Sequence, residues 1–120
     1  MKMREVSFDG QYPVDGYGPG GFRIADVWHE GSVVVSLEGV SPIETPLTLG
    51  GLGPVLALAD RVDVVLVGQG EDIAPLPVKL RVAFEEAGIG VEIMSTPSAC
   101  RTYNVLLSEA RRVAAVLTAL

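Results

Sequence analysis

Hydrophobic residues in the second half of the chain follow the pattern of two buried strands separated by an amphipathic helix. Residues 62–67 form a β-branched apolar run that ends at Gly68-Gln69-Gly70, and residues 91–94 form a second one. Pro77 suits the first helical position and Gly88 the position just past the helix end. The expected apolar face of this helix consists of Leu76, Leu80, Ala83, Phe84 and Ala87. The order strand, helix, strand predicts a right-handed crossover between parallel neighbours.

A second helix is expected directly after residue 94. Thr96 offers a hydroxyl that can cap a helix whose first residue is Pro97. Its inward-facing stripe would be Ala99, Tyr103, Leu106 and Leu107. No helix breaker stands between Glu109 and the apolar segment 112–117, so periodicity alone allows the helix to continue to Leu120.

The first half of the chain is richer in turn-forming residues. A short strand is expected at 4–8, followed by a Gly- and Pro-rich entry segment. Residues 22–28 and 32–37 are β-rich runs, and His29-Glu30-Gly31 between them predicts a hairpin. Residues 55–59 fit one short helical turn. These elements predict a single α/β domain over residues 1–120, with a mixed sheet and packed helices.

Composition narrows the classes of partner. The 120 residues carry a formal net charge of −6, which disfavours nucleic acid because DNA binding needs cationic side chains at the phosphates. No apolar run is long enough to span a membrane and no signal core follows Met1, so we expect a cytoplasmic protein, with docking on a membrane-bound complex left open. One Cys and one His make a disulfide or a structural metal improbable, and no cofactor is indicated.

The loops after the two parallel strands are the place where a ligand would be expected, because ligands in open α/β sheets bind at the carboxyl edge of the strands. The second loop also opens a helix, whose free N–H groups favour an anion. The alternative is that the glycines only form a turn and Thr96 only caps its helix. The candidate ligand-binding residues are Gly68, Gln69, Gly70, Thr96, Cys100, Arg101, Thr102 and Asn104.

Cys100 is the one candidate for covalent chemistry. The start of the helix and the neighbouring Arg101 could lower the pKa of its thiol, which would suit a nucleophile or a redox sensor. Free cysteines are also common as small buried hydrophobic residues, and the only imidazole, His29, is expected in a distant turn. We therefore assign no catalytic residue. The nearby arginines Arg101, Arg111 and Arg112 fit surface ion pairs or a docking edge.

Three segments in this order resemble a known family. They are Gly16-Tyr17-Gly18 leading into Gly21-Phe22-Arg23-Ile24, residues 63–70, and residues 88–106. The chain resembles the MTH-domain proteins, small α/β proteins whose relatives include a mitochondrial complex I assembly factor and an adipogenesis-associated protein. This chain departs from the family pattern at Ile43, Gln69 and Ala110, where the family usually has Trp, Thr and Gly.

The resemblance implies a mixed sheet with packed helices in which residues 112–117 form the final strand. It also implies a noncatalytic protein-binding or assembly module, without an agreed reaction or cofactor. The alternative is a small-molecule or anion-binding protein, or an enzyme, that uses the crevice between loops 68–70 and 95–104.

Overall fold

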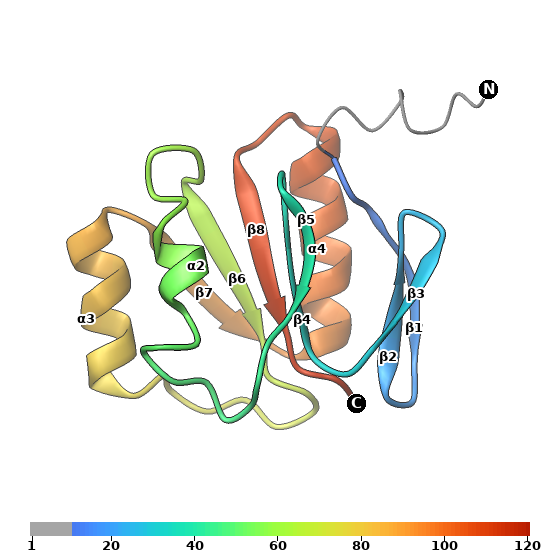
Figure 1. Cartoon of the computed structure of the whole chain (residues 1–120), viewed down its shortest axis with the longest axis horizontal. Helices are drawn as coiled ribbons and strands as arrows, with labels where there is room; N and C mark the ends of the chain where they lie inside the picture. The colour runs from blue at the N-terminus through green and yellow to red at the C-terminus, as the bar shows by residue number, and fades with distance from the viewer. Residues whose placement is uncertain (1–10) are drawn as a thin grey trace.

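Two β-sheets organise the chain in the computed structural model, which describes residues 11–120 (Figure 1). The smaller sheet is antiparallel and consists of β1 (Val14–Gly18), β2 (Gly21–Ile24) and β3 (Val27–Glu30). The larger sheet has the strand order β5-β4-β8-β6-β7. Its strands are β4 (Val33–Ser36), β5 (Gly39–Pro42), β6 (Val64–Gly68), β7 (Gly90–Met94) and β8 (Val113–Leu117). The helices are α2 (Gly53–Leu56), α3 (Val78–Ala87) and α4 (Thr96–Ser108).

The larger sheet is mixed, as predicted. β6 is parallel to both β7 and β8, whereas β4 is antiparallel to β8 and β5. The unit β6-α3-β7 confirms that the two predicted strands are parallel neighbours with a helix between them. The expectation that residues 91–94 form a buried strand is wrong, because β7 is the edge strand and its side chains are half-buried or exposed.

Helix α3 has nearly the bounds that the sequence indicates, whereas the end of α4 is decided by the backbone. Pro77 is the N-cap of α3 rather than its first residue, and Gly88 follows the helix with a φ of 77°. Helix α4 ends at Ser108, and Ala110 then adopts a φ of 60° that turns the chain out of the helical path. Residues 113–117 form β8 instead of continuing α4, which confirms the final strand implied by the family resemblance.

The hairpin predicted between residues 22–28 and 32–37 is wrong. Ala25 and Asp26 both have positive φ angles and fold the first run back on itself, so that β2 pairs with β3. Gly31, with a φ of 82°, lies where the chain leaves the small sheet, and β4 pairs with β5 and β8. The helical turn expected at 55–59 is present as α2, two residues earlier. The strand expected at 4–8 lies outside the described residues.

Two hydrophobic cores lie on opposite faces of the larger sheet. One core is enclosed by α4 and the small sheet and includes Phe22, Leu66 and Tyr103. The other lies under α2 and α3 and includes Val55 and Phe84. Figure 1 shows the same arrangement, with α2 and α3 at one end and the small sheet beyond α4 at the other. Alternate residues of β6 and β8 belong to the two cores, so these strands hold the molecule together.

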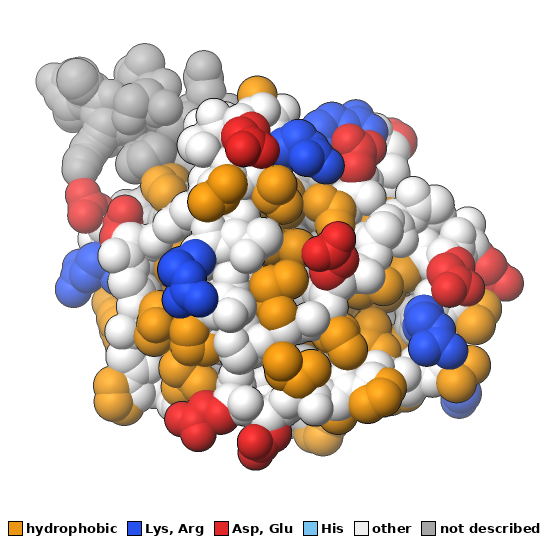
Figure 2. All heavy atoms as spheres, turned by 180° about the vertical axis from the view of Figure 1, so that it is seen from behind, with side chains coloured by type: hydrophobic (Ala, Val, Ile, Leu, Met, Phe, Trp, Pro, Cys, Tyr) orange, Lys and Arg blue, Asp and Glu red, His pale blue; other side chains and the backbone are white. Residues whose placement is uncertain are grey.

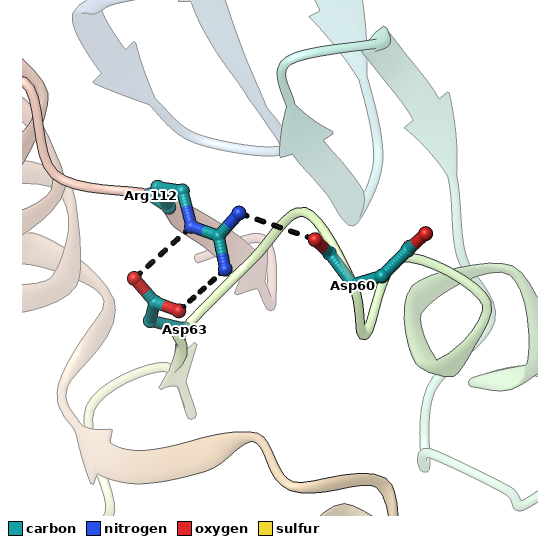
Figure 3. Close-up of polar contacts among 3 residues, drawn as sticks. All are labelled: Asp60, Asp63 and Arg112. Carbon is teal, nitrogen blue, oxygen red and sulfur yellow. Dashed lines mark hydrogen bonds and ion pairs between the residues drawn. The ribbon is translucent and has the colours of Figure 1, made fainter.

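An exposed ion pair joins the starts of β6 and β8 (Figure 3). The Arg112 guanidinium donates to both carboxylate oxygens of Asp63, at 2.8 and 3.2 Å, and to the backbone carbonyl of Asp60. The hydrogen bond from Arg112 holds the pKa of the Asp63 carboxyl below its ordinary value. The sequence suggested surface ion pairs or a docking edge for the arginines. Arg112 forms such an ion pair, with Asp63.

Candidate functional site

The two loops singled out in the sequence lie side by side and close on each other. The backbone N–H of Gln69 donates to the Met94 carbonyl, and the N–H of Thr96 donates to the Gly70 carbonyl, each at 2.9 Å. A Cβ atom on Gly68 would lie 2.9 Å from the Cα of Thr96 and 3.0 Å from the Cβ of Ala99. Glycine at position 68 is thus what allows α4 to start directly against the end of β6.

Thr96 ties the ends of three strands together. Its buried hydroxyl accepts from the N–H of Gly70 and donates to the carbonyl of Thr118, both at 2.8 Å. The predicted role of Thr96 as the helix cap is wrong, because the hydroxyl of Ser95 accepts from the N–H of Ser98 instead. These bonds join the two loops at the carboxyl ends of the strands.

Cys100 lies in the core on the inner face of α4, with 4% of its surface exposed. Burial raises the pKa of its thiol to about 11, and this outweighs the opposing effect of the Arg101 guanidinium. Burial also raises the pKa of Tyr103, whose hydroxyl is buried without a hydrogen-bond partner in the structure. The environment therefore holds the thiol in its protonated form, which is a poor nucleophile.

The remaining candidates on α4 are Arg101, Thr102 and Asn104. Asn104 binds both backbone groups of Val14: its Oδ1 accepts from the N–H at 2.9 Å and its Nδ2 donates to the carbonyl at 2.8 Å. Asn104 therefore fastens β1 to α4. Arg101 is exposed and Thr102 is half-buried. The structure brings together Gly68, Gln69, Gly70 and Thr96, and it places Cys100 and Asn104 elsewhere.

An open groove that the sequence did not reveal lies beside Gln69. It has a volume of about 440 Å³ and runs between the segment around Pro46 and the loop that leads into α3. The Oε1 of Gln69 accepts from the N–H of Ala74 and so shapes this loop. Gln69 and Thr118 line the groove at the carboxyl ends of β6 and β8, with Asp72 as its charged residue. The only sequence signal for this groove was Gln69.

These features define a small mixed α/β module in which Thr96 and Asn104 join elements of the fold. Among residues 11–120, no group of three His, Cys, Asp or Glu side chains is arranged to hold a metal ion. The chain belongs to the family described as proteins of unknown function DUF498/DUF598, which matches residues 14–118.

Related proteins extend this assignment. An uncharacterized protein from Rhodobacter capsulatus is 49% identical over 117 residues, which cover 98% of this chain and 92% of that protein. The human NADH dehydrogenase [ubiquinone] 1 alpha subcomplex assembly factor 3 is 38% identical over 60 residues, half of this chain and 33% of the human protein. The resemblance to the MTH-domain proteins is thereby confirmed.

Solved structures confirm the fold. The crystal structure of an outer membrane protein from Bartonella henselae aligns with a TM-score of 0.88 at 43% identity, over 93% of this chain and 98% of that one. A Mth938-like domain from Bordetella pertussis aligns with a TM-score of 0.78 at 27% identity, over 99% and 92%. Within residues 11–120 we find no helix with the length and apolar character needed to cross a bilayer.

Proposed function

We propose that the chain is a noncatalytic protein-binding module that assists the assembly of a multi-subunit complex. The observation that carries this proposal is the relationship to the assembly factors of the NADH dehydrogenase 1 alpha subcomplex, which reaches 110 residues, or 84% of this chain, for the Danio rerio protein. That alignment covers 60% of the Danio protein, and the remaining part of the Danio protein is not aligned with this chain.

The surface supports a binding role. Several large apolar side chains are exposed, among them Trp28 on the small sheet, Leu49, and Val78 on α3. Leu49 and Val78 line the same open hollow, and contiguous exposed apolar surface of this kind marks protein interaction sites. In contrast, Cys100 and Thr96 are buried and serve the fold.

Deleting the gene for this chain in the organism that carries it tests the proposal. We expect less fully assembled respiratory NADH dehydrogenase on native gels, accumulation of partial complexes, and recovery when the gene is restored. A tagged form of the chain should co-purify with subunits of that enzyme. Normal amounts of the assembled complex in the deletion strain would contradict the proposal.

Small-molecule binding is the second candidate, favoured by the groove at Gln69. The volume of the groove is in the range of ligand sites, although Asp72 opposes the small anion that the sequence suggested. A metabolite that co-purifies with the wild-type chain and is lost when Gln69 is replaced by Ala would support this function. The predicted ligand roles of Thr96, Cys100, Arg101, Thr102 and Asn104 stay predictions.

A cytoplasmic location also stays a prediction. The Bartonella relative is named an outer membrane protein. Fractionation of cells should find this chain in the soluble fraction or released from membranes by high salt, as expected for docking on a membrane-bound complex.

A further inference from the structure

The edge strand β7 exposes one side of its backbone. It pairs with β6 on its other side, and within residues 11–120 no further strand follows it in the sheet. Figure 2, which views the molecule from behind, shows hydrophobic side chains interspersed with acidic and basic ones on that side.

The hydrogen bonds at the two ends of β7 show which backbone groups face outward. The N–H of Gly90 donates to the Asp63 carbonyl, and the Met94 carbonyl accepts from the N–H of Gln69, so Gly90 and Met94 turn their backbone groups toward β6. In a parallel ladder, alternate residues face the same neighbouring strand. Val91 and Ile93 therefore turn their N–H and carbonyl groups away from β6, toward the open edge.

The side chains of β7 give this edge a distinct chemistry. Val91 and Ile93 are half-buried and pack against the core under α3. Glu92 lies between them, points to the opposite face of the sheet and is exposed. Natural edge strands are commonly blocked by Pro, Lys or a bulge. The other edge strand, β5, ends in Pro42, whereas β7 has a regular register and a single charge.

We propose that β7 binds an extended segment of another protein, which pairs as an additional strand and places a basic residue opposite Glu92. Its neighbouring residues would be apolar and would lie beside Val91 and Ile93 on the α3 side. This inference rests on the proposed protein-binding function and specifies how the partner is held. Strand addition of this kind obtains affinity from backbone hydrogen bonds and specificity from alternate side chains.

Charge disfavours a second copy of the chain as the occupant of β7. In the antiparallel register that overlaps all of β7, Val91 would form a hydrogen-bonded pair with Ile93 of the second copy. The two Glu92 side chains would then lie directly opposite each other at the closely spaced, non-hydrogen-bonded position. Like charges in this position destabilise a strand pair, and each copy also carries a net charge of −6.

Two short peptides test the pairing. Both are seven residues long and capped at each end; one has the central sequence Val-Lys-Val and the other Val-Glu-Val. We expect the lysine peptide to bind several-fold more tightly and to slow hydrogen exchange of the Val91 and Ile93 amides in NMR spectra. The Glu92 amide, which already faces β6, should change little.

Charge reversal provides the matched control. The variant Glu92→Lys should prefer the glutamate peptide, whereas Glu86→Lys, the same change at an exposed position on α3, should keep the wild-type preference. Equal binding of both peptides, or protection at residues other than Val91 and Ile93, would overturn the proposal. Dimers in sedimentation experiments with Val91 and Ile93 protected in the absence of peptide would overturn it as well.

The outcomes separate this proposal from the function on which it rests. If NADH dehydrogenase subunits co-purify equally with wild type and with Glu92→Lys, the chain binds protein but β7 is not the site. If the lysine peptide protects Val91 and Ile93 but deletion leaves the respiratory complex intact, the edge binds strands and the assembly role fails.

Discussion

Ala110 has a backbone conformation that alanine adopts at a cost. Its φ of 60° lies in the left-handed region, where the Cβ atom is crowded and glycine is favoured. The family pattern usually has glycine here, and the chain must turn at this point to pass from α4 into β8. We expect Ala110→Gly to raise the free energy of unfolding by about 1 kcal/mol, measured by urea denaturation.

The same substitution at an ordinary backbone position is the control for this effect. Ala57 is exposed, as Ala110 is, but has a φ of −68°. Ala57→Gly should therefore lower the free energy of unfolding by about 0.5–1 kcal/mol, because glycine loses more conformational entropy on folding. A loss of stability in both variants would show that Ala110 is not strained.

Cys100 should be unreactive in the folded protein. With its pKa raised to about 11 by burial, the thiolate at pH 8 is about 100-fold scarcer than for a thiol of ordinary pKa. We expect a chromogenic disulfide reagent to label Cys100 only after unfolding in urea. Rapid labelling of the native protein would restore the redox-sensor hypothesis.

The same thiol links stability to pH in the alkaline range. Because its folded-state pKa is above the unfolded value of 9.0, the stabilisation is complete below pH 9 and is lost as the pH rises toward 11. Tyr103, whose pKa is also raised by burial, adds to this loss. The variant Cys100→Ala should lose less stability between pH 9 and 11 than wild type.

At the scale of elements, one side chain of α4 fastens the first strand of the small sheet by hydrogen bonds. Asn104 makes two hydrogen bonds to Val14, and removing the amide leaves both backbone groups of Val14 without these partners. We expect Asn104→Ala to lower the free energy of unfolding by about 1–3 kcal/mol. The loss should be concentrated in the small sheet.

Trp28 can report this local change, because it is the only tryptophan of the chain and lies on β3. In wild type, Trp28 fluorescence and far-UV circular dichroism should give the same urea midpoint. In Asn104→Ala, the fluorescence midpoint should come at lower urea. Coincident midpoints in the variant would show that Asn104 does not hold the small sheet separately.

Thr96 has a similar role in the larger sheet, where its hydroxyl joins the segments that follow β6 and β8. Thr96→Val keeps the shape of the side chain but leaves the N–H of Gly70 and the carbonyl of Thr118 without their partners in a buried site. We expect a loss of about 2 kcal/mol or more in unfolding free energy. Thr102→Val on the same helix, at a half-buried position, should change stability by much less, and equal effects would contradict the assigned role.

Local patterns predicted the elements whose cause is local. The β-branched run of β6 and the Pro77 and Gly88 signals around α3 gave nearly the observed boundaries. The hairpin was misplaced because Ala25 and Asp26 adopt positive φ angles that their residue types do not require. Thr96 was misassigned because its partners, Gly70 and Thr118, are distant in the sequence. Tertiary contacts decided these cases.

At the scale of the whole molecule, the two cores should unfold together, because β6 and β8 contribute to both. Leu66→Ala removes a side chain from the core under α4, and Leu80→Ala removes one from the core under α3. Each should cost about 2–5 kcal/mol and leave a single transition with an unchanged dependence on urea. A second transition in either variant would show that the cores are independent.

The sequence predicted where the two candidate loops lie but not whether a cavity exists between them. Parallel pairing of β6 and β7 requires their carboxyl ends to meet, so the loops at Gly68 and Thr96 had to be neighbours. Whether the loops leave a cavity depends on atomic contacts that no spacing rule describes. The open groove instead combines Gln69 with residues near Pro46, and these come together only in the folded chain.

The position of β8 has a consequence for synthesis on the ribosome. β8 follows every other described strand in the chain, yet it lies between β4 and β6 and all five of its residues are buried. The β4-β5 hairpin and the β6-α3-β7 unit emerge first, and neither can join the other before residues 113–117 are released. The nascent chain therefore carries two unmatched strand edges until β8 has left the ribosome, and binding by a chaperone would protect it most during this interval.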